Sequence, residues 1–282
     1  MKVLVTGFNG QLGYDLVKRL DHLGIECRGV DIQDFDLTKA DEVSRYIRDY
    51  APDTVVHCAA FTAVDKAEEA RELCYAVNVT GTENVARVCR EIGARMMYFS
   101  TDYVFNGEGE QPFEIDSPRA AQSYYGLTKG EGEDKVRELV DRHFIVRISW
   151  VFGINGHNFV KTMLKLGRER SELTVVNDQI GSPTYTADLA ILLADMLQTD
   201  RYGTYHASNE GYCSWYDFAA VIMAEAGLPC QVRPVTSDQY PTKAVRPKNS
   251  RLSKTSLDRA GFDRLPSWQD ALSRYLKELE NT

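Results

Sequence analysis

Long apolar runs without charge are missing from this sequence, and none is long enough to cross a bilayer. The basic stretch and apolar stretch of a signal peptide are missing too, because the chain opens with MKVLVTG and passes directly into a strand-like run. We therefore expect a cytoplasmic protein with no partner in a membrane.

Metal-binding and redox patterns are also missing. The six cysteines never approach CxxC spacing, and none has a histidine at the spacing of metal ligands. We expect no metal site, and we interpret the cysteines as reduced, mostly buried thiols. Internal repeats are absent as well, which excludes a solenoid.

Positive charge is in the minority. Lys and Arg number 33 against 41 Asp and Glu, for a formal net charge of −8. A nucleic-acid backbone would meet net repulsion, so we expect a small-molecule substrate and no nucleic acid. The hydrophobic content of 43% is enough to fill a sizeable core.

Short apolar runs alternate with longer amphipathic segments in the first half of the chain. The predicted strands are Val3 to Thr6, the run that ends at Asp31, and residues 54–58, 96–99 and 144–148, and the first predicted helix spans residues 11–23. Alternation of this kind predicts right-handed crossovers. The fold class is therefore α/β, a Rossmann-type doubly wound parallel sheet with helices on both faces.

The pattern loosens after about residue 150, although residues 186–198 and 214–226 still have helical spacing. We expect residues 1–150 to form a dinucleotide-binding domain. Residues 151–282 should form mainly a smaller substrate-binding lobe, with one or two segments returning to the sheet.

Three glycines, Gly7, Gly10 and Gly13, stand between the first strand and the first helix. Residues without a Cβ permit a tight turn and let the backbone approach a pyrophosphate at the helix N-terminus. Glycine also marks ordinary turns, but the position inside a βαβ unit favours a cofactor site. The residues between the glycines that we assign to this site are Asn9, Gln11 and Leu12.

Asp31 lies at the end of the second strand, where an acidic residue can accept hydrogen bonds from the adenosine ribose. A carboxylate there would repel a 2′-phosphate, so we expect NADH to be preferred. Arg28 nearby leaves NADPH possible, and a solvated aspartate at a strand end is the alternative.

Tyr125 and Lys129 are four residues apart at the predicted start of a helix, so both can emerge on one face. An ammonium close to a phenol favours the ionised phenol and lowers its pKa. The same lysine can hydrogen-bond the ribose of a nicotinamide nucleotide. Tyr124 has no such partner, because residue 128 is threonine.

Several segments together resemble one family. The GxxGxxG spacing and the Tyr-x-x-x-Lys pair resemble the extended short-chain dehydrogenase/reductases, and Ser100 to Gly107 (STDYVFNG) resembles the signature of the dTDP-4-dehydrorhamnose reductases among them. Further similar segments are residues 58–65, 147–153, 156–160, 179–184 and 213–218. Phe61 and Ile148 differ from the residues expected at these positions in that family. We expect these differences to affect how the substrate fits rather than the reaction itself.

The resemblance implies catalytic roles for three residues. Thr101 would hold the substrate carbonyl, with Ser100 as the alternative, Tyr125 would supply the proton, and Lys129 would tune Tyr125 and anchor the cofactor. Related dehydratases carry a glutamate where this chain has Tyr103. Dehydration is therefore disfavoured, because its acid-base group is missing.

The resemblance also implies further cofactor contacts. Asp36 and Leu37 would lie beside the adenine, and Ala59, Ala60 and Thr62 would pass next to the dinucleotide, although small residues at a strand end are also common packing. Asn78 would bridge the cofactor region and Lys129. A local bond to the backbone is the alternative for an asparagine inside a helix.

On the substrate side, the similar segments point to Asp102, Val104, Trp150 and Asn158. Trp150 could instead be a core residue. Between residues 243 and 254 the chain carries five basic residues and no acidic one, and Arg246 is our candidate for gripping a diphosphate. A solvated basic loop is the alternative.

The implied activity is NAD(P)H-dependent reduction of dTDP-4-dehydro-L-rhamnose at C4, by a monomer or homodimer. Two alternatives stay open. One is an epimerase, or a reductase of another nucleotide sugar, that uses the same Tyr and Lys. The other is a regulatory subunit that binds the cofactor without catalysis.

Overall fold

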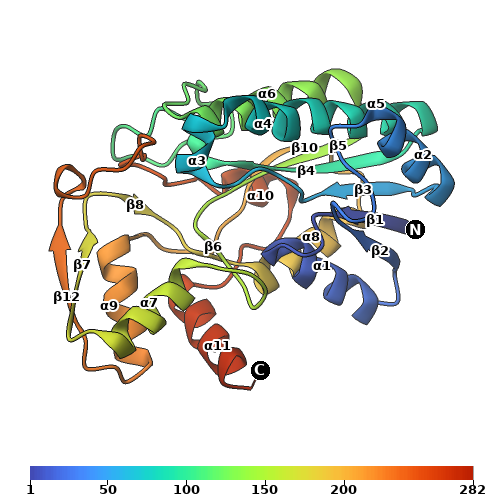
Figure 1. Cartoon of the computed structure of the whole chain (residues 1–282). Coiled ribbons are helices and arrows are strands. Elements are labelled where there is room, and N and C mark those ends of the chain that lie inside the picture. The colour runs from blue at the N-terminus through green and yellow to red at the C-terminus, as the bar shows by residue number, and fades with distance from the viewer. Residues whose placement is uncertain (282) are drawn as a thin grey trace.

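A six-stranded parallel sheet forms the centre of the computed structural model, which describes residues 1–281 (Figure 1). The strand order is β10-β5-β4-β3-β1-β2, and every neighbouring pair is parallel. The strands are β1 (Lys2–Thr6), β2 (Glu26–Val30), β3 (Thr54–His57), β4 (Arg95–Thr101), β5 (His143–Ile148) and β10 (Gly203–His206). The α/β fold class with a parallel sheet is confirmed.

Helices cover both faces of this sheet (Figure 1). On one face lie α2 (Ala40–Tyr50), α5 (Thr82–Ile92) and α6 (Tyr124–Leu139), and on the other lie α1 (Gln11–His22), α8 (Thr186–Leu197) and α10 (Thr255–Ala260). Successive side chains of a strand enter opposite cores, as the period of two requires. On β4, for example, Met97 packs on the α1 side and Tyr98 on the α5 side.

Strand order reverses beside β1, whose neighbours are β2 and β3. In open parallel sheets, ligands bind in the crevice outside the carboxyl ends of the strands at such a point. The short helices that follow β3 and β4 are α3 (Val64–Glu69), α4 (Arg71–Tyr75), the π-helix η1 (Ala76–Gly81) and the 3₁₀ turn η2 (Asp102–Val104).

The C-terminal half builds a second core from Phe152, Phe218, Trp268 and their neighbours. Its helices are α7 (Phe159–Glu169), α9 (Trp215–Glu225) and α11 (Trp268–Glu280), with the 3₁₀ turn η3 (Ser237–Gln239). Its strands are β6 (Val151–Phe152), β7 (Glu172–Val176), β8 (Ile180–Gly181), β9 (Thr184–Tyr185), β11 (Cys213–Ser214) and β12 (Gln231–Val235). This half also supplies β10 and α8 to the central sheet.

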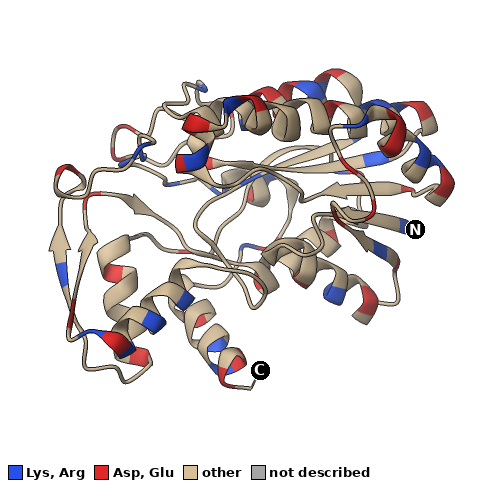
Figure 2. Ribbon diagram, viewed as in Figure 1, with Lys and Arg blue, Asp and Glu red and all other residues tan. Residues whose placement is uncertain are grey.

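The predicted strands and helices match the structure to within a few residues. Strand β2 ends at Val30, so Asp31 begins the following turn rather than ending the strand. All six cysteines are free thiols, four of them buried. Charges of both signs are interspersed along the helices that cover the sheet (Figure 2). Among residues 1–281 no helix is long and apolar enough to cross a membrane.

Candidate active site

A cavity of about 780 Å³ lies at the carboxyl ends of the parallel strands. Strands β1 to β5 contribute residues where they end, among them Thr6 at the end of β1, Ala59 and Ala60 after β3, and Thr101 at the end of β4. The C-terminal half closes the cavity with Trp150, His157 and Trp215. This is the crevice that the strand order predicts.

The glycine turn forms one wall of this cavity. Gly7 has a φ of +69°, and a Cβ there would lie 2.6 Å from the Ala59 nitrogen. A Cβ on Gly13 would collide with the Gly7 carbonyl oxygen. Because these positions exclude side chains, the backbone and the N-terminus of α1 stay open to the cavity. Gly10, Gln11 and Leu12 line the cavity as well.

An acidic corner follows β2. Asp31, Asp36 and Leu37 line the cavity, together with Ala59, Ala60 and Thr62 after β3. The Asp31 carboxylate accepts hydrogen bonds from the backbone nitrogens of Asn9 (3.0 Å) and Ile32 (2.8 Å). Hydrogen bonds from Thr38 hold the pKa of Asp36 below its usual value. The Asp36 carboxylate therefore stays ionised at neutral pH.

Helix α6 presents the predicted pair. The Ser123 hydroxyl caps this helix by accepting a hydrogen bond from the Gly126 nitrogen at 3.2 Å. Tyr125 and Lys129 follow on its first two turns, and both line the cavity together with Thr101. The structure thus brings the three residues predicted as catalytic to one place, beside the glycine turn.

Burial dominates the titration of this pair. It raises the pKa of the Tyr125 phenol, the negative charge of Asp102 adds to the rise, and a hydrogen bond with Thr101 opposes it. We expected Lys129 to lower the pKa of Tyr125; the net shift is upward because desolvation dominates it. Burial also lowers the pKa of Lys129 to about 7, against the charge of Glu133.

Asp102 lies beside Thr101 and also lines the cavity. Its carboxylate accepts a hydrogen bond from the Thr101 hydroxyl at 2.9 Å. Burial raises the pKa of Asp102 to about 6, although hydrogen bonds from Ser250 and Thr101 oppose the rise. Near neutrality this carboxyl group can therefore exchange a proton.

Two tryptophans form the far wall. Trp150 stacks on Trp215 with ring centroids 3.7 Å apart. The backbone of Trp150 has a φ of +49°, which costs energy in a residue with a side chain. Gly181 leaves room for the ring, since a Cβ there would lie 2.8 Å from Trp150. Sequence reasoning placed Trp150 at the site but missed Trp215, although its segment had been matched to the family.

Five residues predicted to contact ligands do not line the cavity: Asn9, Asn78, Val104, Asn158 and Arg246. Val104 is buried in a small core with Phe105 and Leu252, away from the cavity lining. Thr101 and Asp102 precede it in the same signature, but the 3₁₀ turn η2 points Val104 inward. Asn9 does not line the cavity either: its backbone nitrogen binds Asp31.

Asn158, expected to bind the substrate, has a structural role instead. Its side chain caps α7 by accepting from the Lys161 nitrogen at 3.0 Å. Its amide nitrogen donates to Gln11, the Gly153 carbonyl and Tyr275, at 2.9 to 3.1 Å. Since this amide is fully engaged and does not line the cavity, it braces α1 against the C-terminal half.

Asn78, expected on the cofactor, also lies behind the cavity wall. Its amide accepts from the Phe61 nitrogen at 2.8 Å and donates to the Thr128 hydroxyl at 3.1 Å. It therefore ties the segment after β3 to α6 next to Lys129, without touching the lysine itself.

Arg246, our candidate for the diphosphate, lies one layer away from the cavity lining. It forms an ion pair with Asp65 and donates a hydrogen bond to the Tyr103 hydroxyl at 3.1 Å. Tyr103 does line the cavity. The structure thus places this guanidinium behind a wall residue, where it is paired rather than free.

Sequence reasoning missed several further lining residues. Those without a predicted role are Ile32, Phe35, Val64, Val77, Phe99, Tyr103, Ser149, Val151, Gly156 and His157. Three of them, Ile32, Tyr103 and Ser149, lie within two residues after strands β2, β4 and β5. A rule that the first residues after each parallel strand face the ligand would have found these three.

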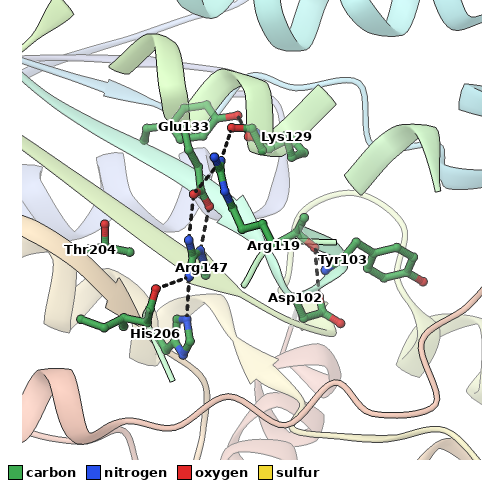
Figure 3. A network of polar contacts seen from close by, with 12 residues as sticks. Asp102, Tyr103, Arg119, Lys129, Glu133, Arg147, Thr204 and His206 are labelled. Atoms are coloured by element: carbon green, nitrogen blue, oxygen red, sulfur yellow. Dashed lines mark hydrogen bonds and ion pairs between the residues drawn. The ribbon is translucent and has the colours of Figure 1, made fainter. Parts of the chain in front are cut away.

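A buried ion-pair network supports α6 behind Lys129 (Figure 3). The Glu133 carboxylate accepts hydrogen bonds from Arg147 at 2.7 and 2.9 Å, and from Arg137 at 2.8 Å. Arg147 also donates to the Ile115 carbonyl and contacts His206 on β10. Burial opposes the ionisation of Glu133, but the hydrogen bonds and charge of Arg147 hold its pKa at about 2.

Comparison with known proteins agrees with this geometry. A family model described as the RmlD substrate binding domain matches residues 1–281. The spore coat polysaccharide biosynthesis protein SpsK of Bacillus subtilis is 43% identical, over 98% of this chain and 97% of that protein. The dTDP-4-dehydrorhamnose reductase of Escherichia coli is 38% identical, over 100% of this chain and 99% of that protein.

A solved structure is similar over the same length. The dTDP-4-dehydrorhamnose reductase of Bacillus anthracis, in complex with NADP, is 42% identical, with a TM-score of 0.96 over 99% of this chain and 100% of that chain. This chain therefore belongs to the RmlD substrate binding domain family, and its relatives include dTDP-4-dehydrorhamnose reductases.

Proposed function

We propose that this protein reduces the C4 carbonyl of dTDP-4-dehydro-L-rhamnose to give dTDP-L-rhamnose, with a nicotinamide cofactor. The observation that carries the proposal is that Thr101, Tyr125 and Lys129 line the same cavity as the glycine turn. The E. coli and B. anthracis relatives named as reductases of this sugar support the choice of substrate.

The residues of the turn fit a dinucleotide, because Gly7 and Gly13 leave bare backbone where a Cβ would fill the space. When bound, the cofactor supplies the hydride. Gly7, Gly10, Gln11, Leu12 and Gly13 would bind the pyrophosphate, and Asp36, Leu37, Ala59, Ala60 and Thr62 would border the rest of the dinucleotide. Lys129 would hydrogen-bond the ribose.

On the substrate side, Thr101 orients the carbonyl oxygen and Tyr125 donates the proton to it. The raised pKa of Tyr125 keeps the phenol protonated at neutral pH, which suits an acid. Asp102 and Trp150 border the sugar. We propose that residues 151–282 mainly complete this substrate side, and that Arg246 reaches the diphosphate after leaving Asp65.

The test follows loss of NADH absorbance when the protein meets dTDP-4-dehydro-L-rhamnose, produced in place from dTDP-glucose by purified enzymes. Tyr125→Phe should lower kcat by about 10²- to 10⁴-fold, because the proton donor is removed. Tyr124→Phe is the matched control, since Tyr124 does not line the cavity, and should keep the activity.

Each contrary outcome has a distinct meaning. Conversion of a nucleotide sugar without net NADH consumption would indicate an epimerase. Binding of NADH without any turnover, together with recovery of the protein in a larger complex, would indicate a regulatory subunit. Full activity of Tyr125→Phe would remove Tyr125 from the mechanism.

We further propose that NADH is preferred over NADPH, which stays possible. The Asp31 carboxylate at the cavity wall supports this preference, since it would repel a 2′-phosphate. The B. anthracis relative holds NADP, so related sites do accept that phosphate. Asp31→Asn should raise the ratio of kcat/KM for NADPH to that for NADH by about tenfold, or ~1.4 kcal/mol. A wild type that already prefers NADPH would contradict the assignment.

We place the reaction in the cytoplasm, and the oligomeric state is proposed as monomer or homodimer. The six unpaired thiols support a reducing compartment. Cell fractionation and light scattering of the purified protein test these two points.

A further inference from the structure

The ring of Tyr98 lies directly under the Lys129 ammonium. Tyr98 is on β4, three residues before Thr101, and its side chain is fully buried. The Lys129 Nζ is 4.1 Å from the centroid of the Tyr98 ring. A cation at this distance is attracted by the negative face of an aromatic ring, and the attraction strengthens when water is excluded.

The ring itself is held in place from several sides. The Tyr98 hydroxyl donates a hydrogen bond to the Lys129 carbonyl oxygen at 3.1 Å. His57 stacks on the ring with centroids 6.1 Å apart, and hydrogen bonds with Thr6 and Thr82 fix His57. Gly132, one turn after Lys129, leaves room for the hydroxyl that a Cβ would fill. The ring is therefore preorganised for the lysine.

Few other interactions stabilise the Lys129 ammonium. No hydrogen bond or ion pair joins its Nζ to another residue within 1–281. The titratable groups that interact with it are Glu133 on α6, His57 at the end of β3, Cys58 just after β3 and Cys74 on α4. The Glu133 carboxylate accepts hydrogen bonds from Arg147 (Figure 3) and from Arg137, and burial keeps His57 neutral by lowering its pKa to about 3.

We propose that Tyr98 is a positioning residue for Lys129: its ring face holds the charged ammonium at the cavity wall, in reach of Tyr125 and of the cofactor ribose. The assignment rests on the proposed reductase function for its catalytic meaning. The contact between ring and ammonium is independent of that function and can be measured without substrate.

The first experiment measures how Lys129 titrates in the cofactor-free protein. An amine-selective reagent is applied over a range of pH, and labelling of the Lys129 peptide is followed by mass spectrometry. In Tyr98→Leu the midpoint for Lys129 should fall by about one pH unit, because the charged form loses the ring. In Tyr98→Phe, which keeps the ring, the midpoint should stay within a few tenths of the wild-type value.

The second experiment measures the consequence for the reaction. The pH above which kcat/KM declines should move down by the same amount in Tyr98→Leu, and cofactor affinity at pH 8 should fall about tenfold. Phe144→Leu is the matched control: it removes a fully buried ring from the neighbouring strand β5, on the opposite face of the sheet. It should lower thermal stability without moving either pH midpoint.

If Tyr98→Leu does not fold, fluorinated phenylalanine at position 98 keeps the shape of the ring but weakens its negative face. The Lys129 midpoint should then fall stepwise with each added fluorine. An unchanged midpoint in a folded ring-free or fluorinated variant would overturn the inference. The wild type could fail to reduce the sugar while the Lys129 midpoint still shifts in the variants that remove or fluorinate the ring. That result would overturn the proposed function but not the role of Tyr98.

Discussion

At the scale of single residues, burial pushes three ionisable side chains of the cavity toward their neutral forms. The pKa of Tyr125 rises, that of Asp102 rises to about 6, and that of Lys129 falls to about 7. Groups that titrate near the working pH can exchange protons during a reaction. The same shifts carry a cost in stability, because the unfolded chain ionises these groups freely.

Asp102 gives a prediction with a definite sign. Its folded pKa of about 6 exceeds its ordinary value of 3.8, so the native state binds more protons between these values. Stability should therefore fall as pH rises from 4 to 6, by about 3 kcal/mol from this group. Urea unfolding at pH 4.5 and 7.5 should show a smaller fall for Asp102→Asn than for the wild type.

The exposed Asp116→Asn is the control for this comparison and should retain the wild-type difference between the two pH values. An equal fall for Asp102→Asn and the wild type would show that Asp102 is already ionised in the folded protein at low pH.

Which residues sequence reasoning placed correctly depends on how local their geometry is. The Tyr125–Lys129 pair and the glycine turn follow from the spacing of one helix and one turn, and both reach the cavity. Trp215 and Tyr98 meet their partners only through tertiary contacts, which no local spacing encodes. Val104 does not line the cavity, although its motif was matched. A sequence motif does not show which of its successive side chains point into the protein interior.

At the scale of elements, two of the three buried glycines of α6, Gly130 and Gly132, have opposite surroundings. A Cβ on Gly132 would collide with the Tyr98 hydroxyl and lie 2.9 Å from the Asn78 carbonyl oxygen. A Cβ on Gly130 would meet only Arg119 at 3.5 Å and Val104 at 3.8 Å, which is ordinary contact. Helix α6 therefore packs tightly against β4 at Gly132, whereas Gly130 leaves room for a methyl group.

Alanine at these two positions should act in opposite directions. Gly130→Ala should stabilise the protein by about 0.5–1 kcal/mol, since alanine favours a helix over glycine. Gly132→Ala should destabilise it by about 1–3 kcal/mol through overpacking, and should lower the activity by displacing Lys129. Denaturant unfolding and kcat measure both. Equal effects would mean that α6 can shift away from the sheet.

At the scale of the whole molecule, the cavity joins residues from Thr6 to Trp215. The positions of the central strands in the sequence were predictable, because each strand and helix has its own pattern of hydrophobic residues. The way the second half closes the cavity was not, because short strands such as β6 and β9 pair across long sequence distances. A ligand that spans both halves should stabilise the protein as one unit.

NADH at a hundred times its Kd should add about 2.7 kcal/mol and raise Tm by about 5 °C in a single transition. Gly7→Ala should abolish this shift, because the new Cβ collides with Ala59. Gly24→Ala is the matched control, since Gly24 also has a positive φ of +68° but has nothing within 4 Å. The Tm of Gly24→Ala should be lower than that of the wild type, but NADH should raise it by the same amount as in the wild type. A persistent shift in Gly7→Ala would place the cofactor elsewhere.

The order in which the sheet is completed has a consequence during synthesis. Strand β10 comes from residues 203–206, yet it pairs with β5, which ends at Ile148. While the ribosome makes the intervening segment, β5 is an unpaired edge to which another strand can add. At about 5–20 residues per second, that edge stays open for several seconds in every nascent chain. Folding factors that act on nascent chains would meet this protein at that stage, with β5 as the segment to protect.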